Sequence, residues 1–473
     1  MSIIGRHIEQ DVLFECVNSK RPEFLVVYGR RRVGKTFLVK EYFNDRFSFY
    51  ATGLPNAKTR DQLRVFGQEL IRYGSEEKKM PADWLEAFER LRKLLESGKT
   101  FCHPGAGKMI VFLDELPWMD TAKSDFRMAL DYFWNSWGSS RKDLLLIVCG
   151  SATSWIMDHI LNDAGGLYNR ITRQLHLAPF TLRECETFLN YENEAVSKKQ
   201  AMDFYMVFGG IPYYLNMFDR RLSVAQNIDM LVFDENGPLH YEYDILFRTL
   251  FKHAERYEAL INAMAKRKSG VARNELIKDH GALQGSSLTK ALKELEECHF
   301  IRKYRDFTKK SQECIYQIID PFVLFCLNFV SDNRIQDWSS FMGSPGYYAW
   351  RGNAFEVLCF NHLPEIRAAL GISGVSTQEC AWRSRKSEPG VQIDLLIDRR
   401  DDIINVCEMK YSDGEYVIDR DYETKLNAKC RVFREETGTK KTVQLVLISA
   451  EGLKRNAHSD IVMQLVTGED LFR

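Results

Sequence analysis

The residues best suited to chemistry lie in a glycine-rich segment near the N-terminus. The segment runs from Gly29 to Thr36, follows the apolar run Phe24–Tyr28 and leads into a helical pattern at Phe37–Phe43. A GxxxxGK[ST] pattern between a strand and a helix predicts a loop whose backbone N–H groups wrap phosphates at a helix N-terminus. The alternative is a chance match in a turn, which the flanking elements disfavour. The candidate nucleotide contacts are Gly29, Arg30, Arg31, Arg32, Val33, Gly34, Lys35, Thr36 and Phe37.

Lys35 is expected to reach the β- and γ-phosphates, and Thr36 to hold Mg²⁺. A second apolar run, Met109–Leu113, ends in the carboxylate pair Asp114-Glu115. Buried strands of a parallel sheet deliver such side chains to the crevice at their C-terminal ends. We therefore expect Asp114 to bind Mg²⁺ and Glu115 to polarise an attacking water. An ordinary acidic turn is the alternative.

Two more residues are candidates near this crevice. The apolar run Leu144–Cys149 is followed by Ser151, whose hydroxyl is suited either to sensing a γ-phosphate or to capping a helix. Arg170 is either an arginine finger, acting within the chain or across a subunit interface, or a solvated surface side chain. A second glycine cluster, 104–108, precedes a strand instead of following one, so we predict a loop there and no phosphate site.

The N-terminal motifs resemble those of the archaeal-type P-loop ATPases, within the broad AAA+/STAND group. The resemblance rests on Ile4-Gly5-Arg6, the glycine-rich loop, Leu113-Asp114-Glu115 and Gly209-Gly210-Ile211-Pro212-Tyr213-Tyr214-Leu215. It implies ATP in preference to GTP, a helical lid after the ATPase core, and a position for Pro212 near the nucleotide base.

A second set of charged residues lies near the C-terminus. Asp394 and the pair Glu408-x-Lys410 fall on two β-prone segments joined by a short turn, and Glu356 lies on the preceding helical segment. Residues two apart in a strand point to the same face, so Glu408 and Lys410 are expected to converge. Carboxylates around a lysine suit divalent-metal phosphodiester cleavage, with Glu356, Asp394 and Glu408 as metal ligands and Lys410 as the catalytic cation.

This set resembles the PD-(D/E)xK restriction-endonuclease-like superfamily, specifically the domain of unknown function 234 that follows archaeal-type ATPase modules. The pieces are Trp350-x-Gly352-x-x-Phe355-Glu356, Gln392-Ile393-Asp394-Leu395 and Glu408-Met409-Lys410, with Ile393 in place of the proline. Three alternatives stay open: the fold without turnover, a network of salt bridges, or solvated charges. Tyr416, Tyr422, Lys425 and Lys429 suit either a DNA-facing stripe or a solvated helix face.

Between these regions, three helical segments and two short strands predict a winged helix. Residues 251–310 hold 14 Lys and Arg against 8 Asp and Glu, so this stretch is basic. The outward face of its third helix, 286–297, carries a mixed set, Lys290, Lys293, Glu294 and Glu297, with few of the side chains that read bases. The wing tip between the two strands holds Lys309-Lys310, which suit phosphate contact better than base reading. Interdomain packing or a protein contact is the alternative to DNA binding.

These sites require a large multidomain chain, and the composition agrees. The 473 residues carry 65 Lys and Arg against 65 Asp and Glu, and 45% are hydrophobic, which excludes a disordered chain or an indiscriminate polycation. The 11 cysteines form no CxxC pair, and Met1–Arg6 lead into polar sequence without the apolar region of a secretory signal. We expect a cytoplasmic protein with no membrane partner, and a homo-oligomer stays open.

The predicted fold class is α/β multidomain: a P-loop parallel sheet at 1–180, a helical lid at 181–240, a winged helix-turn-helix at 241–335 and a restriction-endonuclease-like α/β domain at 345–473. The predicted function is a Mg²⁺-dependent ATPase coupled to a DNA-binding winged helix and a metal-dependent DNA nuclease domain. The alternative is a nucleotide-switched regulator or scaffold whose nuclease-like domain is silent.

Overall fold

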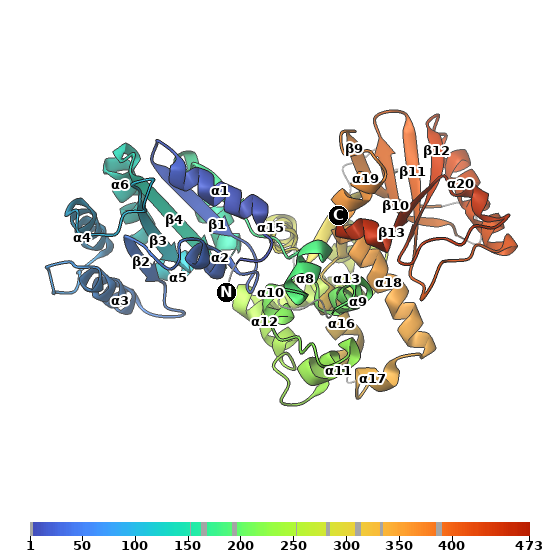
Figure 1. Ribbon diagram of the computed structural model, residues 1–473, viewed down its shortest axis with the longest axis horizontal. Helices are drawn as coiled ribbons and strands as arrows, with labels where there is room; N and C mark the ends of the chain where they lie inside the picture. The colour runs from blue at the N-terminus through green and yellow to red at the C-terminus, as the bar shows by residue number, and fades with distance from the viewer. Residues whose placement is uncertain are drawn as a thin grey trace. The chain divides into compact units, whose positions relative to one another are not determined.

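A computed structural model describes residues 3–151, 153–161, 168–191, 196–251, 253–280, 284–307, 314–331, 334–384 and 390–473. The chain divides into two compact units, Met1–Ala178 and Pro179–Arg473 (Figure 1). Each unit is described separately below.

The first unit is built on a parallel sheet with strand order β2-β3-β4-β1-β5. Every residue of β1, β3 and β4 is buried, because helices cover both faces of a parallel sheet. The strands are β1 (Glu23–Tyr28), β2 (Phe49–Thr52), β3 (Met109–Asp114), β4 (Leu144–Gly150) and β5 (Arg173–His176). Sequence patterning predicted the three central strands but missed β2 and β5, which are short and only half buried.

The core of this unit lies where β1, β3 and β4 meet three amphipathic helices. Phe24 of β1 packs on Trp134 with ring centroids 5.0 Å apart, and Trp84 packs edge-on against Phe126 at 4.8 Å. The helices are α1 (His7–Asn18), α2 (Lys35–Tyr42), α3 (Thr59–Arg72), α4 (Trp84–Glu96), α5 (Leu116–Met119), α6 (Phe126–Ser136) and α7 (Thr153–Ile156). This packing fixes the ends of the strands that carry the candidate site.

The second unit begins with helices that carry their own start signals. Thr181 with Glu184, Ser197 with Gln200, and Ser223 with Gln226 form capping boxes, in which each side chain satisfies the other's free backbone N–H. The helices are α8 (Leu182–Leu189), α9 (Lys198–Phe208), α10 (Pro212–Leu215), α11 (Val224–Ile228) and α12 (Glu242–Leu250).

The middle of this unit has the order helix, strand, helix, helix, strand, strand. Strand β6 pairs antiparallel with β8, and β7 pairs antiparallel with β8. The elements are α13 (Ala254–Ala265), β6 (Val271–Ala272), α14 (Arg273–His280), α15 (Gly285–Glu297), β7 (Ile301–Asp306) and β8 (Cys314–Ile318). The inner side of α15 is apolar, with Leu288, Leu292 and Leu295 buried in the core.

The C-terminal part joins this region through one sheet, ordered β13-β12-β11-β10-β9-β7-β8-β6 within the described residues. Strand β7 runs parallel to β9, with Arg305 opposite Cys380 and Asp306 opposite Ala381. The remaining elements are α16 (Pro321–Phe325), α17 (Trp338–Phe341), α18 (Pro345–Asn361), α19 (Leu363–Ala369), β9 (Thr377–Arg383), β10 (Gln392–Arg399), β11 (Ile403–Lys410), α20 (Arg420–Thr437), β12 (Thr442–Ser449) and β13 (Gln464–Thr467). The regions predicted as two separate domains thus share a sheet.

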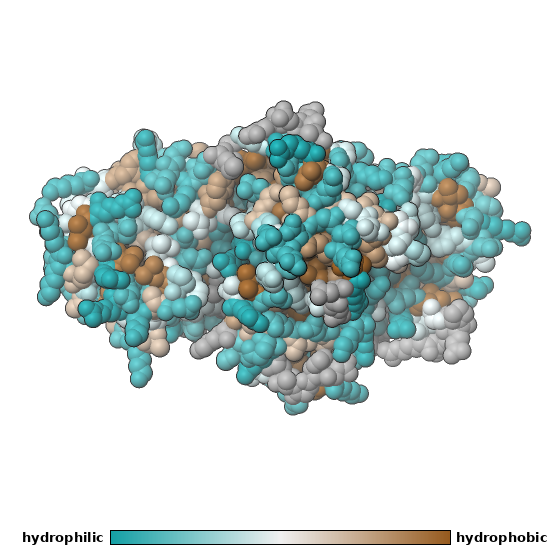
Figure 2. Space-filling view, turned by 90° about the horizontal axis from the view of Figure 1, so that it is seen from below, coloured by the Kyte–Doolittle hydropathy of each residue, from teal (hydrophilic) through white to brown (hydrophobic). Residues whose placement is uncertain are grey.

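The described helices include none with the length and apolarity to cross a membrane. On the face drawn in Figure 2, hydrophilic residues predominate and apolar ones are scattered among them in small patches.

Candidate functional site

The glycine-rich loop leaves the C-terminal end of β1 and enters α2. Two glycines permit its path: Gly29 has φ 143° and Gly34 has φ 91°, in the region that favours glycine. At Gly29 a Cβ atom would lie 2.3 Å from the carbonyl oxygen of Leu177, so only glycine fits there. Strand β4 lies between β1 and β3, and the three strands are parallel. Their C-terminal ends therefore carry the loop, Ser151 and Asp114-Glu115 to the same end of the sheet.

Lys35 is buried at the start of α2 and points back into the loop. Its Nζ donates to the carbonyl oxygens of Gly29 and Arg30, each at 2.8 Å. An ammonium held by loop carbonyls is fixed inside the loop's curve, where a phosphate anion would meet it. The predicted contact of Lys35 with the β- and γ-phosphates stays a prediction.

The hydroxyl of Thr36 donates to Asp114 Oδ2 at 2.9 Å, which joins the loop to the end of β3. The backbone N–H of Glu115 donates to the other oxygen, Asp114 Oδ1, at 2.9 Å. Burial and the neighbouring Glu115 raise the pKa of Asp114, while hydrogen bonds from Thr36 and Cys149 act in the opposite direction. The Cys149 thiol was not among the sequence candidates, because an isolated buried cysteine in a strand carries no signal.

Glu115 has a left-handed backbone, φ 48° and ψ 45°, immediately before α5. Ser151 Oγ donates to Glu115 Oε2 at 2.9 Å, and the Ser151 N–H approaches the same oxygen at 3.4 Å. Ser151 thus contacts the Glu115 carboxylate. Its predicted roles, sensing a γ-phosphate or capping a helix, stay predictions.

Arg6, which precedes the glycine-rich motif in the chain, contacts the backbone of the loop. Its guanidinium donates to the carbonyl oxygen of Val33 at 3.4 Å and to that of Ala178 at 2.7 Å, and Glu9 accepts from it at 3.1 Å. Sequence reasoning noted Arg6 only as part of the family resemblance, because its partners are backbone atoms distant in the chain.

The other predicted contacts vary in exposure. Arg30 is buried, Arg32 is half buried with φ 72°, and Arg31 and Phe37 are exposed. Arg170 is exposed, in a 3₁₀ turn at Tyr168–Arg170.

Pro212 begins α10 in the second unit, so its predicted contact with the base stays a prediction. Gly210, two residues before Pro212, has no room for a Cβ atom, which would lie 1.9 Å from the carbonyl oxygen of Phe180.

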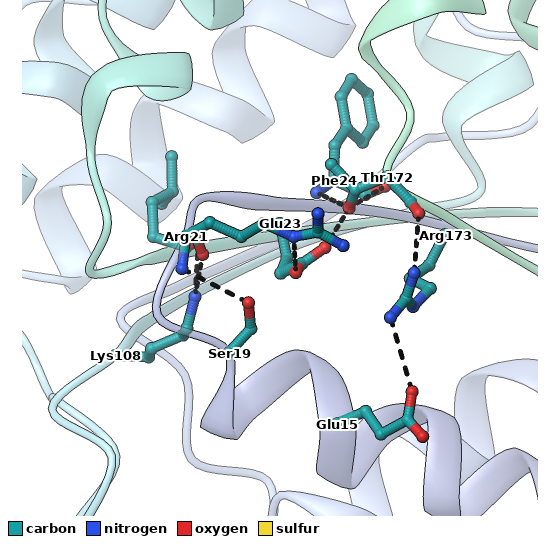
Figure 3. Close-up of polar contacts among 9 residues, drawn as sticks. Glu15, Ser19, Arg21, Glu23, Phe24, Lys108, Thr172 and Arg173 are labelled. Carbon is teal, nitrogen blue, oxygen red and sulfur yellow. Dashed lines mark hydrogen bonds and ion pairs between the residues drawn. The ribbon is translucent and has the colours of Figure 1, made fainter.

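The second glycine cluster is a loop before β3, as predicted, and its lysine has a structural role (Figure 3). Lys108 is buried and donates to the carbonyl oxygen of Arg21 at 2.6 Å. Nearby, the buried Glu23 accepts from Arg21 at 3.0 Å and from the hydroxyl of Thr172. These contacts tie the N-terminal end of β1 to β3 and β5, at the opposite end of the sheet from the phosphate loop.

In the C-terminal part, Asp394 and Glu408 lie on neighbouring antiparallel strands. Leu395, the residue after Asp394, is opposite Cys407, the residue before Glu408. Helix α18 packs against β11 and carries Glu356. Burial, followed by the nearby Asp394, raises the pKa of Glu356 to about 7. Glu356, Asp394, Glu408 and Lys410 therefore lie close enough for their charges to interact.

The side chain of Glu408, however, is already held by cations. Lys429 donates to its Oε2 at 2.6 Å, Lys410 lies 2.9 Å from its Oε1, and the hydroxyl of Tyr422 donates to Oε1 at 2.5 Å. Burial alone would raise the pKa of Glu408, but the charges of Lys429 and Lys410 and these hydrogen bonds lower it to about 2. Tyr422 and Lys429 thus point to Glu408 and form neither a DNA-facing stripe nor a solvated face.

Across the described parts of the chain, no three His, Cys, Asp or Glu side chains are arranged to hold a metal ion. Lysine ammonium groups neutralise Glu408 in this arrangement. The assignment of Glu356, Asp394 and Glu408 as metal ligands stays a prediction.

In the middle region, Lys290 and Lys293 are exposed on α15, as predicted. Glu294 was predicted on the same outward face but is buried, where it accepts a hydrogen bond from the hydroxyl of Tyr257. The predicted wing tip at Lys309-Lys310 lies outside the described residues.

Residues 4–218 match the family model described as an ATPase domain predominantly from Archaea. This part of the chain is similar to archaeal ATPase domains, and the enzyme class expected from the sequence, an ATP hydrolase with a P-loop, is confirmed. The match extends past Ala178 through α10, so it includes Pro212.

An uncharacterized protein of Methanocaldococcus jannaschii is 25% identical over 338 residues, which cover 70% of this chain and 69% of that protein. Among solved structures, a Walker-type ATPase of Pyrococcus abyssi is 20% identical, covers 69% of this chain and 96% of its own, and superposes with a TM-score of 0.49. The ORC2 protein of Aeropyrum pernix is 14% identical over 72% of this chain and 96% of its own, with a TM-score of 0.45.

Proposed function

We propose that the chain hydrolyses ATP at the crevice formed by the loop after β1 and the ends of β3 and β4. Lys35 binds the β- and γ-phosphates, backbone N–H groups from Gly29 to Thr36 cradle them, and Glu115 accepts the proton of the attacking water. Ser151 holds Glu115 in position through its hydroxyl. The single observation that supports this most is the chain of hydrogen bonds from Thr36 through Asp114 and Glu115 to Ser151.

The donors at this crevice fit Mg²⁺. A hydroxyl and a carboxylate, Thr36 and Asp114, lie together at 2.9 Å, and both are the hard oxygen ligands that Mg²⁺ takes alongside phosphate oxygens. When bound there, Mg²⁺ would neutralise the negative charge that develops on the phosphates. Thr36 and Asp114 would hold it.

Replacing the lysine tests this proposal. Lys35→Ala should lower kcat for ATP by at least 100-fold, because the charge that stabilises the transferred phosphoryl group is lost. Phosphate release is the measurement, and Lys40→Ala, which removes a lysine from the same helix, is the matched control. Equal hydrolysis by Lys35→Ala and wild type would refute the assignment.

Arg170, which is exposed, is proposed to contact the γ-phosphate, either within one chain or across the interface of a homo-oligomer. Mixing inactive Arg170→Ala with inactive Lys35→Ala separates the two arrangements. Recovered activity means that the arginine of one copy serves the site of another, and no recovery means that it acts within its own chain. An Arg170→Ala variant with full activity would contradict both.

We also propose that α13 to β8 is a winged helix that binds DNA through phosphates. Its order of elements and the exposed Lys290 and Lys293 on α15 support this. Because Glu294 is buried, the outward face of α15 offers few side chains that could read bases. Binding should therefore be largely independent of DNA sequence. Lys290→Ala with Lys293→Ala should weaken binding equally to two unrelated duplexes, as measured by fluorescence anisotropy.

For the C-terminal part, the sequence predicts a metal-dependent DNA nuclease, and the alternative is a silent nuclease-like domain in a nucleotide-switched regulator. The ion pairs of Lys410 and Lys429 with Glu408 favour the silent form, because a metal would have to displace an ammonium group. Nicking of a supercoiled plasmid in Mg²⁺ decides. Equal background nicking by wild type and Asp394→Ala supports the silent form. Nicking by wild type that Asp394→Ala abolishes, with ATPase activity kept, establishes the nuclease.

A further inference from the structure

A cavity of about 750 Å³ lies where the middle region and the C-terminal part share their sheet. We call it the basic groove. Its walls come from β7, β8, the segment entering β9, the end of β10 with the turn after it, and the residue before β12. Its lining is Lys303, Tyr304, Arg305, Cys314, Ser376, Thr377, Gln378, Glu379, Asp398, Arg399, Arg400 and Lys441.

The groove has five cations and two carboxylates in its lining, and both carboxylates are neutralised locally. Asp398 accepts from Lys441 at 2.7 Å, and Glu379 accepts from Arg367 at 3.2 Å. Arg399, in turn, pairs with Asp401. The acids therefore do not compete for a ligand.

Three cations of the lining stay available. Lys303, Arg305 and Arg400 are exposed, and no carboxylate of the described residues forms an ion pair with any of them. The hydroxyl of Ser376 and the amide of Gln378 add hydrogen-bond donors beside them, while the hydroxyl of Thr377 donates to Glu379. A surface with unneutralised cations and neutral donors fits phosphate oxygens.

We propose that the basic groove binds the phosphate backbone of DNA and extends the contact made by the middle region onto the C-terminal part. Lys303 and Arg305 are two residues apart in β7, so they lie on the same face of the strand, about 6.6 Å apart along it. This spacing suits successive phosphates of one DNA backbone. Arg400 reaches the groove from a different strand pair. Cations spread over separate segments match an extended polyanion better than a small anion held at one point.

This inference rests on the proposed DNA binding, and the experiment separates the two. The triple change Lys303→Ala, Arg305→Ala and Arg400→Ala is compared with a control that removes the same charge from exposed sites elsewhere, Arg420→Ala, Lys454→Ala and Arg455→Ala. Binding of a labelled 30-base-pair duplex to the full chain is measured by fluorescence anisotropy at several salt concentrations. Circular dichroism checks the fold of each variant.

The groove variant should bind at least tenfold more weakly than wild type at physiological salt. Its slope of log affinity against log salt should be shallower by about 2.7, since each lost phosphate contact removes about 0.9. The control should keep both values. If the groove variant binds like the control while Lys290→Ala with Lys293→Ala binds weakly, the groove inference is overturned and DNA binding stands. If wild type binds no duplex, both fall.

Discussion

At the scale of single residues, the contact between Ser151 and Glu115 links two strands of the parallel sheet. The hydroxyl at the end of β4 donates to the carboxylate at the end of β3. A carboxylate held in one orientation accepts a proton from a fixed water more readily than one that rotates freely. Ser151 is therefore a positioning residue for the proposed base.

Ser151→Ala should lower kcat for ATP about tenfold, equivalent to about 1.4 kcal/mol in the barrier. KM should change little, because the phosphate-binding groups Lys35 and Thr36 are untouched. Steady-state kinetics measures both constants, and Ser139→Ala, an exposed serine of the same unit, is the control. An unchanged kcat would show that Glu115 does not need this hydrogen bond.

Glu408 gives a pH-dependent prediction. Its pKa in the folded chain is lowered from 4.5 to about 2, so its ion pairs contribute stability above pH 4.5. That contribution is lost as the pH falls through 4.5 toward 2, where the carboxylate is protonated. The difference in unfolding free energy between wild type and Glu408→Gln should shrink by about 3 kcal/mol over this window.

Urea unfolding followed by tryptophan fluorescence, at a series of pH values between 2 and 7, measures this difference. The exposed Glu451, changed to Gln, is the control and should show no comparable trend. A constant difference between wild type and Glu408→Gln would mean that Lys410 and Lys429 do not stabilise the charged carboxylate.

At the scale of elements, the loop between β1 and α2 depends on backbone geometry at Gly29. Gly29→Ala should weaken ATP binding at least tenfold, because its Cβ would collide with the carbonyl oxygen of Leu177 and move the loop. Gly105→Ala is the matched comparison, with φ 84° and no atom within 4 Å of the added Cβ. It should cost only about 1 kcal/mol of stability and leave ATP affinity unchanged.

Isothermal titration calorimetry with ATP and Mg²⁺ measures these affinities. Equal affinities for Gly29→Ala and wild type would mean that the loop accommodates a side chain, against the close approach of Leu177.

At the scale of the whole molecule, the two compact units predict two thermal transitions. ATP with Mg²⁺ at 100 times its Kd should stabilise the unit 1–178 by about 2.7 kcal/mol and raise the temperature of one transition only. Differential scanning calorimetry measures the shift, and Lys35→Ala is the control that should lack it. A single transition that moves as a whole would contradict independent unfolding of the units.

The shared sheet also changes how the second unit is understood. Because β9 pairs with β7, residues 345–473 alone would expose the edge of β9 at Cys380 and Ala381. The C-terminal part and the middle region are consequently expected to unfold together, in the second of the two transitions.

The sequence by itself determined the local features. Strand, glycine loop and helix around Lys35 were predictable, because hydrophobic runs and glycines act through neighbouring residues. Asp114-Glu115, the three central strands and α15 were predictable for the same reason. The short strands β2 and β5 were not, since few residues in them are fully buried.

Only the tertiary structure decided which distant groups meet. The contacts of Ser151 with Glu115, of Arg6 with Val33, and of Lys429 with Glu408 join residues 21 to 36 positions apart. No periodicity records such pairs, because strand order and helix packing bring them together. The same holds for the pairing of β7 with β9, which creates the basic groove from segments that the sequence assigned to separate domains.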